Sequence, residues 1–481
     1  MCDIGLIGLA VMGQNLSLNI SSKGFKIGVY NRTYERTEET MKRAKEENLV
    51  VYGYKTVEEL INNLKKPRKV ILLIKAGPAV DENISNILKH FEKGDIIIDG
   101  GNEWYINSER RIKLCKEKDV EYLAMGVSGG EAGARYGCSF MPGGSKYAYD
   151  CVKEILEKCS AQVGNSPCVT YIGPGSSGNY VKMVHNGIEY GDMQLISESY
   201  VIMKHILKYD NQKLSEVFNK WNEGILNSYL IEITANILAK KDDLTNNYLV
   251  DMILDIAGAK GTGKWTMLEA TERGIPCPTM CAALDARNIS VFKELRTKAE
   301  SNFNKDNILI DPNEDLNDFE NDLLNALYCC KIISYTQGLF LLKQVSEEMN
   351  WKLNLGEIAR IWRGGCIIRA VFLDHNEFSD DIKNKLPSLR KIVLMATKYS
   401  IPIPAFSASL AYFQMCKPKG IILDHTHIGE QIVKEIITPC GDNKYACKFF
   451  IFLWKNMKVY YSILSIHIHF KNYKTKNNTN K

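Results

Sequence analysis

The order of apolar and polar positions divides the chain into an N-terminal part of alternating strands and helices and a later part that is helical almost throughout. Short apolar runs typical of buried strands occur at 4–7, 26–30, 70–74, 95–99 and 122–125. Strands that alternate with helical stretches indicate a parallel sheet covered by helices. We therefore expect an α/β Rossmann-like, doubly wound domain over residues 1–177.

After a glycine-rich connector at 173–178 the pattern changes, because apolar residues then recur at helical spacing and no strong strand candidate follows. The region 178–415 is therefore predicted to be a large all-helical domain. Its first helix spans 179–207, which is long enough to cross a domain or to form a subunit interface. The other expected helices cover 214–240, 265–272, 280–297, 315–349 and 354–372, and a short helix covers 406–412.

Charge separates a tail, predicted at 416–481, from the rest of the chain. Residues 444–481 contain eight lysines and no acidic residue, and removing those lysines from the net charge of +5 leaves −3. A mildly acidic body does not favour nucleic acid or an anionic membrane as partner. Lys455 and Lys458 interrupt the apolar part of the tail, and no run reaches the ~18 uncharged apolar residues of a membrane span. Residues 471–481 are of low complexity and unsuited to a core.

The cysteines indicate the compartment. Fourteen are scattered without a C-x-x-C pair, and no second pair follows Cys277 and Cys281, so we expect no metal site. Irregular thiols, with Asp3 where a signal peptide would be basic, indicate a reduced cytoplasmic protein.

The strand at 4–7 runs into the dinucleotide pattern G-x-A-x-x-G, which begins at Gly8 and ends at Gly13. Gly8 allows the tight turn, Ala10 admits the pyrophosphate, and Gly13 permits close packing of the helix on the strand. The phosphates would bind at the helix N-terminus. The predicted cofactor residues here are Gly8, Leu9, Ala10, Val11, Met12 and Gly13.

The end of the second strand indicates which dinucleotide is bound. An NAD enzyme usually has an acid there for the ribose 2′-hydroxyl, but this chain has Asn31, Arg32 and Thr33. A guanidinium and a hydroxyl suit a 2′-phosphate, so we expect NADP. Further strand ends are rich in glycine, at 75–78, 100–102 and 126–131. Each alone fits a plain turn, but three in succession indicate ligand binding at the carboxyl edge of the sheet.

Helical geometry places Lys182, His185, Asn186 and Glu189 on one face of the long predicted helix. Such a set can supply a base, an acid and substrate donors, although a solvated charged stripe gives the same pattern. The loop at 258–265 nearly matches a P-loop, but Trp265 stands where Ser or Thr must hold magnesium. It remains suited to a lone phosphate, with Arg287 completing the site.

Several longer motifs carry a family resemblance. They are GLAVMGQNL (8–16), NRT (31–33), KAG (75–77), DGGN (99–102), GVSGGE (126–131), ARYG (134–137), MPGG (141–144), KMVHNGIEYGDMQLI (182–196), KGTGKWT (260–266) and IWRGGCIIR (361–369). From residue 3 to about 415 the chain resembles the decarboxylating 6-phosphogluconate dehydrogenases, NADP enzymes of the pentose phosphate pathway. The long motif at 182–196 is specific, whereas the glycine motifs are shared with other β-hydroxyacid dehydrogenases.

The resemblance implies a metal-independent oxidative decarboxylation of 6-phospho-D-gluconate to D-ribulose 5-phosphate by a homodimer, with 178–415 as its substrate and dimerisation domain. It implies that Lys182 is the general base and Glu189 the acid that protonates the enediol. Lys75, Ala76, Gly77 and Asn102 would then contact the cofactor. The implied substrate residues are Asn102, Ser128, Gly129, Gly130, His185, Asn186, Tyr190, Lys260, Thr262 and Arg287.

The tail departs from this family. Relatives continue into a histidine-bearing segment that enters the neighbouring subunit's active site, and residues 416–481 do not match it. We hypothesise that this end reflects a read-through intron, a frame change or an incorrect gene model, which sequencing the 3′ end of the transcript tests. A genuine alternative tail remains open. So do two other functions: a β-hydroxyacid dehydrogenase for another acid, and an inactive variant that still binds cofactor.

Overall fold

A computed structural model describes residues 1–303, 310–370 and 378–416 of the 481-residue chain. A seven-stranded sheet has the order β3-β2-β1-β4-β5-β6-β7, in which β1 to β6 run parallel and β7 is antiparallel to β6. This is the doubly wound order, extended by one antiparallel edge strand. The strands are β1 Ile4–Ile7, β2 Ile27–Tyr30, β3 Val51–Gly53, β4 Lys69–Leu72, β5 Ile96–Asp99, β6 Glu121–Ser128 and β7 Ser139–Gly144.

Helices cover both faces of this sheet because its strands are apolar on both sides. Ile96 and Ile98 face one core cluster with residues of α1 and α7, whereas Ile97 faces another with residues of α3, α4 and α5. The helices here are α1 Val11–Ser22, α2 Tyr34–Glu46, α3 Val57–Asn62, α4 Pro78–Ile87, α5 Tyr105–Lys116, α6 Gly130–Tyr136 and α7 Lys146–Cys159, and a small hairpin follows, with β8 Gln162–Val163 and β9 Ser166–Pro167.

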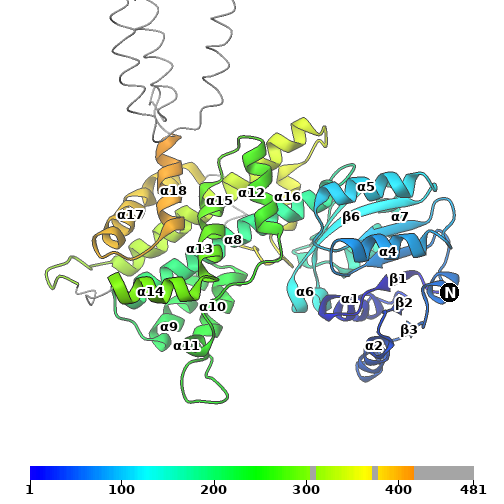
Figure 1. The fold of residues 1–481 in the computed structure, drawn as a ribbon, viewed down its shortest axis with the longest axis horizontal. Helices are drawn as coiled ribbons and strands as arrows, with labels where there is room; N and C mark the ends of the chain where they lie inside the picture. The colour runs from blue at the N-terminus through cyan, green and yellow to red at the C-terminus, as the bar shows by residue number, and fades with distance from the viewer. Residues whose placement is uncertain (304–309, 371–377, 417–481) are drawn as a thin grey trace, which may run out of the picture. The chain divides into compact units, whose positions relative to one another are not determined.

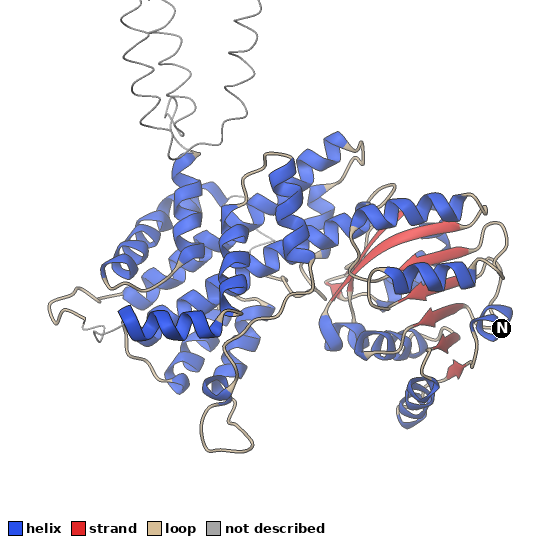
Figure 2. Cartoon of the chain, viewed as in Figure 1, coloured by secondary structure: helices blue, strands red, loops and turns tan. Residues whose placement is uncertain are grey.

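From Ser177 onward the described chain is helical apart from isolated bridges, as Figure 2 shows, so the predicted fold class is confirmed. The elements to Phe413 pack as one compact unit (Figure 1), so a division at residue 177 stays a prediction. The helices are α8 Ser177–His205, α9 Asn211–Asn222, α10 Tyr229–Ala239, α11 Leu249–Met252, α12 Thr262–Glu272, α13 Pro278–Ser290, α14 Lys293–Phe303, α15 Phe319–Glu348, α16 Leu355–Ile361, α17 Phe378–Lys398 and α18 Pro404–Met415.

Three helix predictions were wrong in length, and each break has a local cause. The helix predicted at 214–240 is split, since Asn222 turns the chain by accepting from the amide of Ser228 at 3.0 Å. The helix predicted at 280–297 is split, since Arg296 binds the Ser290 carbonyl at 3.0 Å. The helix predicted at 354–372 ends at Ile361, and Gly365 follows with a φ of 65°; residues 371 and 372 lie outside the described part.

The strand prediction was also incomplete at one edge. Sequence periodicity predicts a strand at 122–125 and a glycine-rich strand end at 126–131, but β6 continues to Ser128. The reason is its pairing with β7, which joins Gly126 to Met141 and Ser128 to Ser139. Neither β7 nor the short β3 was predicted. The predicted tail at 416–481 lies outside the described residues, apart from Cys416.

The N-terminal turn of α8 rests directly on β6 and β7. A Cβ added at Gly178 would lie 2.1 Å from the Ala124 carbonyl oxygen and 2.2 Å from that of Met141, so only glycine permits this approach. The contact fixes the start of α8 against the sheet. The helix therefore carries the residues of its next turn to the carboxyl edge of the strands.

Candidate functional site

Four polar residues predicted as a group lie together on α8. Lys182 Nζ lies 3.4 Å from His185 Nδ1, and that nitrogen lies 3.1 Å from Asn186 Oδ1 and 3.8 Å from Glu189 Oε2. The first three residues are buried, and the Glu189 side chain is 20% exposed. A solvated charged stripe would be exposed, so that interpretation of the pattern is wrong.

Burial changes the protonation of this group. It lowers the pKa of Lys182 from its usual range, and the negative charge of Glu189 opposes this only in part. It raises the pKa of Glu189, while the charge of Lys182 acts in the opposite direction. Burial, together with the charge of Lys182, holds the pKa of His185 well below its usual value. The site thus favours a neutral amine, a neutral imidazole and a protonated carboxyl.

Ser128 and Gly129 enclose the site from the sheet. Ser128 Oγ lies 3.1 Å from His185 Nε2, and the amide of Ile367 donates to the same oxygen at 3.3 Å. Gly129 and Gly130 follow Ser128, with φ of 146° and 59°. The Trp362 ring packs edge-on against His185, with centroids 5.5 Å apart. Sequence reasoning gave Trp362 and Ile367 no role, although both lie in the motif at 361–369.

A second wall comes from α12 and α13. Asn186 Nδ2 donates to Thr262 Oγ1 at 3.1 Å, where Thr262 opens α12. The Arg287 guanidinium lies 3.9 Å from the ring centroid of Tyr190 and donates to the Gly258 carbonyl at 2.8 Å. Lys260 is exposed in the same loop. The predicted phosphate residues are therefore gathered at one end of the α8 face.

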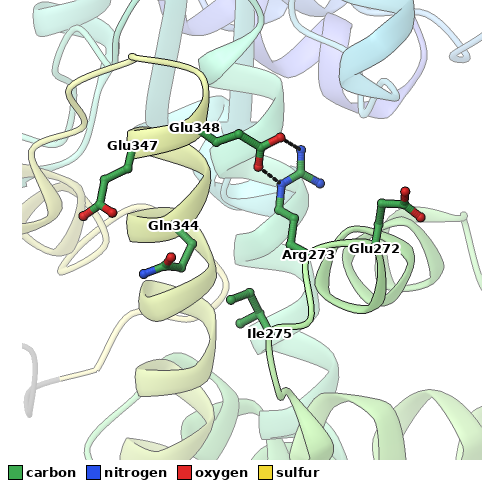
Figure 3. A pocket seen from close by; sticks show the side chains of 6 residues that line it. All are labelled: Glu272, Arg273, Ile275, Gln344, Glu347 and Glu348. Atoms are coloured by element: carbon green, nitrogen blue, oxygen red, sulfur yellow. Dashed lines mark hydrogen bonds and ion pairs between the residues drawn. The ribbon is translucent and has the colours of Figure 1, made fainter.

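Tyr190 and Arg287 also line a pocket of about 160 Å³ between α8 and α13, which Gln194 and Ser290 border. Figure 3 shows a larger pocket, of about 520 Å³, that contains no predicted site residue. There Arg273 Nε pairs with Glu348 Oε2 at 2.8 Å. Because none of the predicted site residues lines this larger pocket, we assign it no role in the chemistry of α8.

The loop between β1 and α1 fits a dinucleotide pyrophosphate. Gly8 has a φ of 102°, and a Cβ at Gly13 would lie 1.8 Å from the Gly8 carbonyl oxygen. Asn31 Oδ1 accepts from the amide of Leu9 at 3.0 Å, which fixes the loop to the end of β2. In α1 itself, Ala10 provides no side-chain cap and the first turn contains no acidic residue. Amide groups of that turn are thus available to an anion.

The other predicted cofactor residues surround this loop. Ala10 and Val11 are exposed and Met12 is half-buried, whereas the Leu9 side chain is buried. Arg32 and Thr33 are exposed after β2, and Lys75 and Asn102 are exposed after β4 and β5. Ala76 and Gly77 are half-buried between them. Asn179 Nδ2, three residues before Lys182, donates to the Gly101 carbonyl at 3.3 Å and ties the loop after β5 to α8.

The fold and this site define a dehydrogenase class: a dinucleotide-binding sheet whose carboxyl edge meets a buried lysine and glutamate on a long helix. The model of the NAD binding domain of 6-phosphogluconate dehydrogenase matches residues 3–173, and the model of the 6-phosphogluconate dehydrogenase C-terminal domain matches residues 178–421. The chain belongs to the 6-phosphogluconate dehydrogenase family.

Individual relatives agree with this membership. A solved structure of Plasmodium falciparum 6-phosphogluconate dehydrogenase, studied in its apo form and in complex with NADP+ and with 6-phosphogluconate, is 94% identical. It matches with a TM-score of 0.85, over 88% of this chain and 94% of that one. Decarboxylating 6-phosphogluconate dehydrogenase 1 of Oryza sativa subsp. japonica is 51% identical over 85% of this chain and 89% of its own. The NADP(+)-dependent, decarboxylating enzyme of Bacillus subtilis strain 168 is 48% identical over 85% of this chain and 91% of its own.

Among the helices in the described ranges, none is long and apolar enough to cross a membrane. The same ranges contain no group of three or more His, Cys, Asp or Glu side chains placed to hold a metal ion.

Proposed function

We propose that this chain catalyses the NADP-dependent oxidative decarboxylation of 6-phospho-D-gluconate to D-ribulose 5-phosphate and CO2. The observation that carries the proposal is the buried pair on α8, where burial lowers the pKa of Lys182 and raises that of Glu189. Two titratable groups with pKa values displaced in opposite directions are the mark of a base and an acid in one site.

Lys182 is the general base of the first step. Its neutral amine takes the proton of the substrate 3-hydroxyl, and its buried position leaves that amine little stabilised as a cation. His185 and Asn186 orient the sugar acid beside it. Since Ser128 and Asn186 hold the two ring nitrogens of His185, the imidazole presents a fixed edge to the substrate.

Decarboxylation needs no metal in this proposal. The ketone formed at C3 lies β to the carboxylate, so it accepts the electron pair released with CO2 when a cation or donor polarises it. Lys182, protonated by the first step, is that cation. Glu189, whose pKa is raised by burial, then delivers a proton to the enediol.

NADP+, when bound, supplies a hydride acceptor. The turn from Gly8 to Gly13 would hold its pyrophosphate, because an uncapped helix N-terminus and close glycine packing meet there. Arg32 and Thr33 would bind the 2′-phosphate. Lys75, Ala76, Gly77 and Asn102 would contact the nicotinamide half. The Plasmodium falciparum relative, which binds NADP+, supports this assignment.

The substrate phosphate would bind at the far end of the α8 face. Tyr190, Lys260, Thr262 and Arg287 gather there, and the guanidinium already packs on the tyrosine ring. Gly129 and Gly130 would approach the carboxylate end, beside Ser128. A phosphate clamp distinguishes this substrate from the unphosphorylated acids of other β-hydroxyacid dehydrogenases.

The proposal includes a cytoplasmic homodimer. An apolar surface, which we call the α14 patch, is formed by Ile253, Leu254, Ile289, Val291, Phe292 and Leu295, each between 55% and 63% exposed. Asp255 joins its two segments through Lys293 Nζ at 2.5 Å and Arg296 Nη1 at 2.8 Å. Patches of this kind mark interfaces. The cysteines of the described residues are free thiols, which suits a reducing compartment.

A specificity assay tests the proposed function. Formation of the reduced dinucleotide and of the decarboxylated ketose should be measured with 6-phosphogluconate and with gluconate, and with NADP+ and with NAD+. We expect kcat/KM to be higher by about 100-fold or more for the phosphorylated acid, because a clamp left without its phosphate loses several charged contacts. Equal rates with gluconate would contradict the assigned substrate, and a preference for NAD+ would contradict the role of Arg32.

A further inference from the structure

We propose that Arg111 and Glu103 are positioning residues that hold the two loops of the nicotinamide half in one arrangement. The inference rests on the proposed function, since it presumes that NADP+ binds across the edge of the sheet. Arg111 lies on α5 with none of its surface exposed, and Glu103 is 2% exposed. Neither residue belongs to the predicted site.

Glu103 and Arg111 bind the backbone amide and the backbone carbonyl of Gly77. Its amide donates to Glu103 Oε2 at 2.9 Å, and its carbonyl accepts from Arg111 Nη2 at 2.9 Å. The guanidinium also binds Glu103 Oε2 through Nη1 at 2.5 Å, which closes a three-membered ring of contacts. Gly77 has a φ of 100° and precedes α4. The ring therefore fixes the path of Lys75, Ala76 and Gly77 after β4.

The same guanidinium reaches the loop after β5. Arg111 Nη1 lies 3.5 Å from Asp99 Oδ2, and Asp99 Oδ1 accepts from the amide of Gly101 at 3.1 Å. Tyr122 donates to the second Asp99 oxygen at 2.8 Å. Since Asn102 follows directly, one buried cation sets the distance between the two loops. Asn179 then joins the second loop to the helix of Lys182.

Both carboxylate oxygens of Glu103 act only as hydrogen-bond acceptors, so a substitution by glutamine should disturb its contacts. Oε1 receives the amide of Trp104 and Nδ2 of Asn107, both at 2.9 Å, while Oε2 receives Gly77 and Arg111. A glutamine has an NH2 group in place of one oxygen, and that group would face two donors whichever way the amide turns. Glu103→Gln must therefore release one pair of contacts.

Arg111 and Glu103 hold loops on only one side of β1, so their positioning role should concern only the nicotinamide half of the cofactor. The pyrophosphate turn follows β1 and Arg32 follows β2, whereas the loops that Arg111 joins follow β4 and β5 on the other side of β1. A dinucleotide lies across this point, where the strand order reverses. Loosening the two loops should therefore affect the nicotinamide half and leave the adenosine half bound.

Binding of the cofactor and of a fragment tests the inference. Affinities for NADP+ and for adenosine 2′,5′-bisphosphate, which lacks nicotinamide, should be measured by calorimetry on the full chain and on Arg111→Lys and Glu103→Gln. We expect the Kd of NADP+ to rise by about 10-fold or more in both variants, with the fragment Kd unchanged within about two-fold. The value of kcat should fall as well, because mispositioned groups slow the reaction.

Arg110→Lys is the matched control. Arg110 is exposed, precedes Arg111 on α5 and binds the Asp81 carboxylate at 2.7 Å, without touching either loop; Arg111 Nε binds the same carboxylate at 2.8 Å. We expect no change in either affinity for this variant. Equal losses of NADP+ and fragment in both test variants, by unfolding or otherwise, would overturn the inference, as would unchanged NADP+ affinity. Failure of the unmodified chain to bind NADP+ would instead overturn the proposed function.

Discussion

Burial on α8 displaces the pKa values of Lys182 and Glu189 in opposite directions, and the proposed chemistry depends on this displacement. Because the charge of each group offsets the effect of burial on the other only in part, the net pKa shifts favour the two forms that the reaction needs before substrate arrives. His185 stays neutral between them. Lys182 is therefore suited to act as the base and Glu189 as the acid, with a neutral His185 between them.

The first prediction concerns the base. Lys182→Met retains an unbranched side chain in an apolar position but removes the amine. We expect kcat to fall by about 10²- to 10⁴-fold, the contribution of a positioned base, with the Kd of NADP+ unchanged. Lys113→Met, an exposed lysine of α5, is the control and should keep full activity. Turnover that survives in Lys182→Met would show that another group is the base.

The second prediction concerns pH. Lys182 must be neutral to act, so activity should rise with pH through its lowered pKa and give the acidic limb of the kcat/KM profile. Glu189 must be protonated, so activity should fall as pH passes through its raised pKa and give the alkaline limb. Both limbs belong to the coupled pair. Glu189→Gln should remove the alkaline limb, and a profile with both limbs intact would contradict the assignment.

At the scale of elements, the sequence predicts five of the seven strands of the sheet, together with the turn and the helix face that carry the site. The pattern at 8–13 predicts the turn, and the spacing of Lys182, His185, Asn186 and Glu189 predicts the helix face that the structure shows. Other features depend on partners distant in sequence. Pairing with β7 lengthens β6. Ile367 reaches Ser128 from 239 residues away, which no local pattern predicts.

The third prediction concerns the docking of α18. Glu198 on α8 accepts the amides of Ala405 at 2.8 Å and Phe406 at 2.9 Å, and burial raises its pKa to about 7. Because this folded-state pKa exceeds the ordinary 4.5, the stability that it contributes is present below pH 4.5 and lost as pH rises through 7. The free energy of unfolding lost between pH 4.5 and pH 7 is on the order of 3 kcal/mol.

Urea unfolding of wild type and Glu198→Gln at pH 4.5 and pH 8 measures this effect. The variant has no titrating group at this position. Between pH 4.5 and pH 8, the free energy of unfolding of the wild type should therefore fall by about 3 kcal/mol relative to that of the variant. Amide exchange at Ala405 and Phe406 locates the effect at α18. A difference that stays constant between the two pH values would contradict the prediction.

At the scale of the whole molecule, the α14 patch predicts self-association. A charge at the centre of an apolar interface is strongly unfavourable, because it must be buried without a partner. We expect Phe292→Asp combined with Leu295→Asp to convert a dimer into a monomer in light scattering at micromolar concentration. Leu244→Asp is the control, since Leu244 is 94% exposed and lies outside the patch. A double variant that remains dimeric would exclude this patch as the interface.

The ratio of CO2 to NADPH formed by the 481-residue chain from 6-phosphogluconate and NADP+ tests the proposed decarboxylation most directly. We expect a ratio of one, because every oxidation at C3 produces a β-keto acid that loses its carboxylate in the same site. NADPH without CO2 would indicate another β-hydroxyacid dehydrogenase. NADP+ binding with neither product would indicate that the chain is an inactive member of the family, and either result would contradict oxidative decarboxylation by this chain.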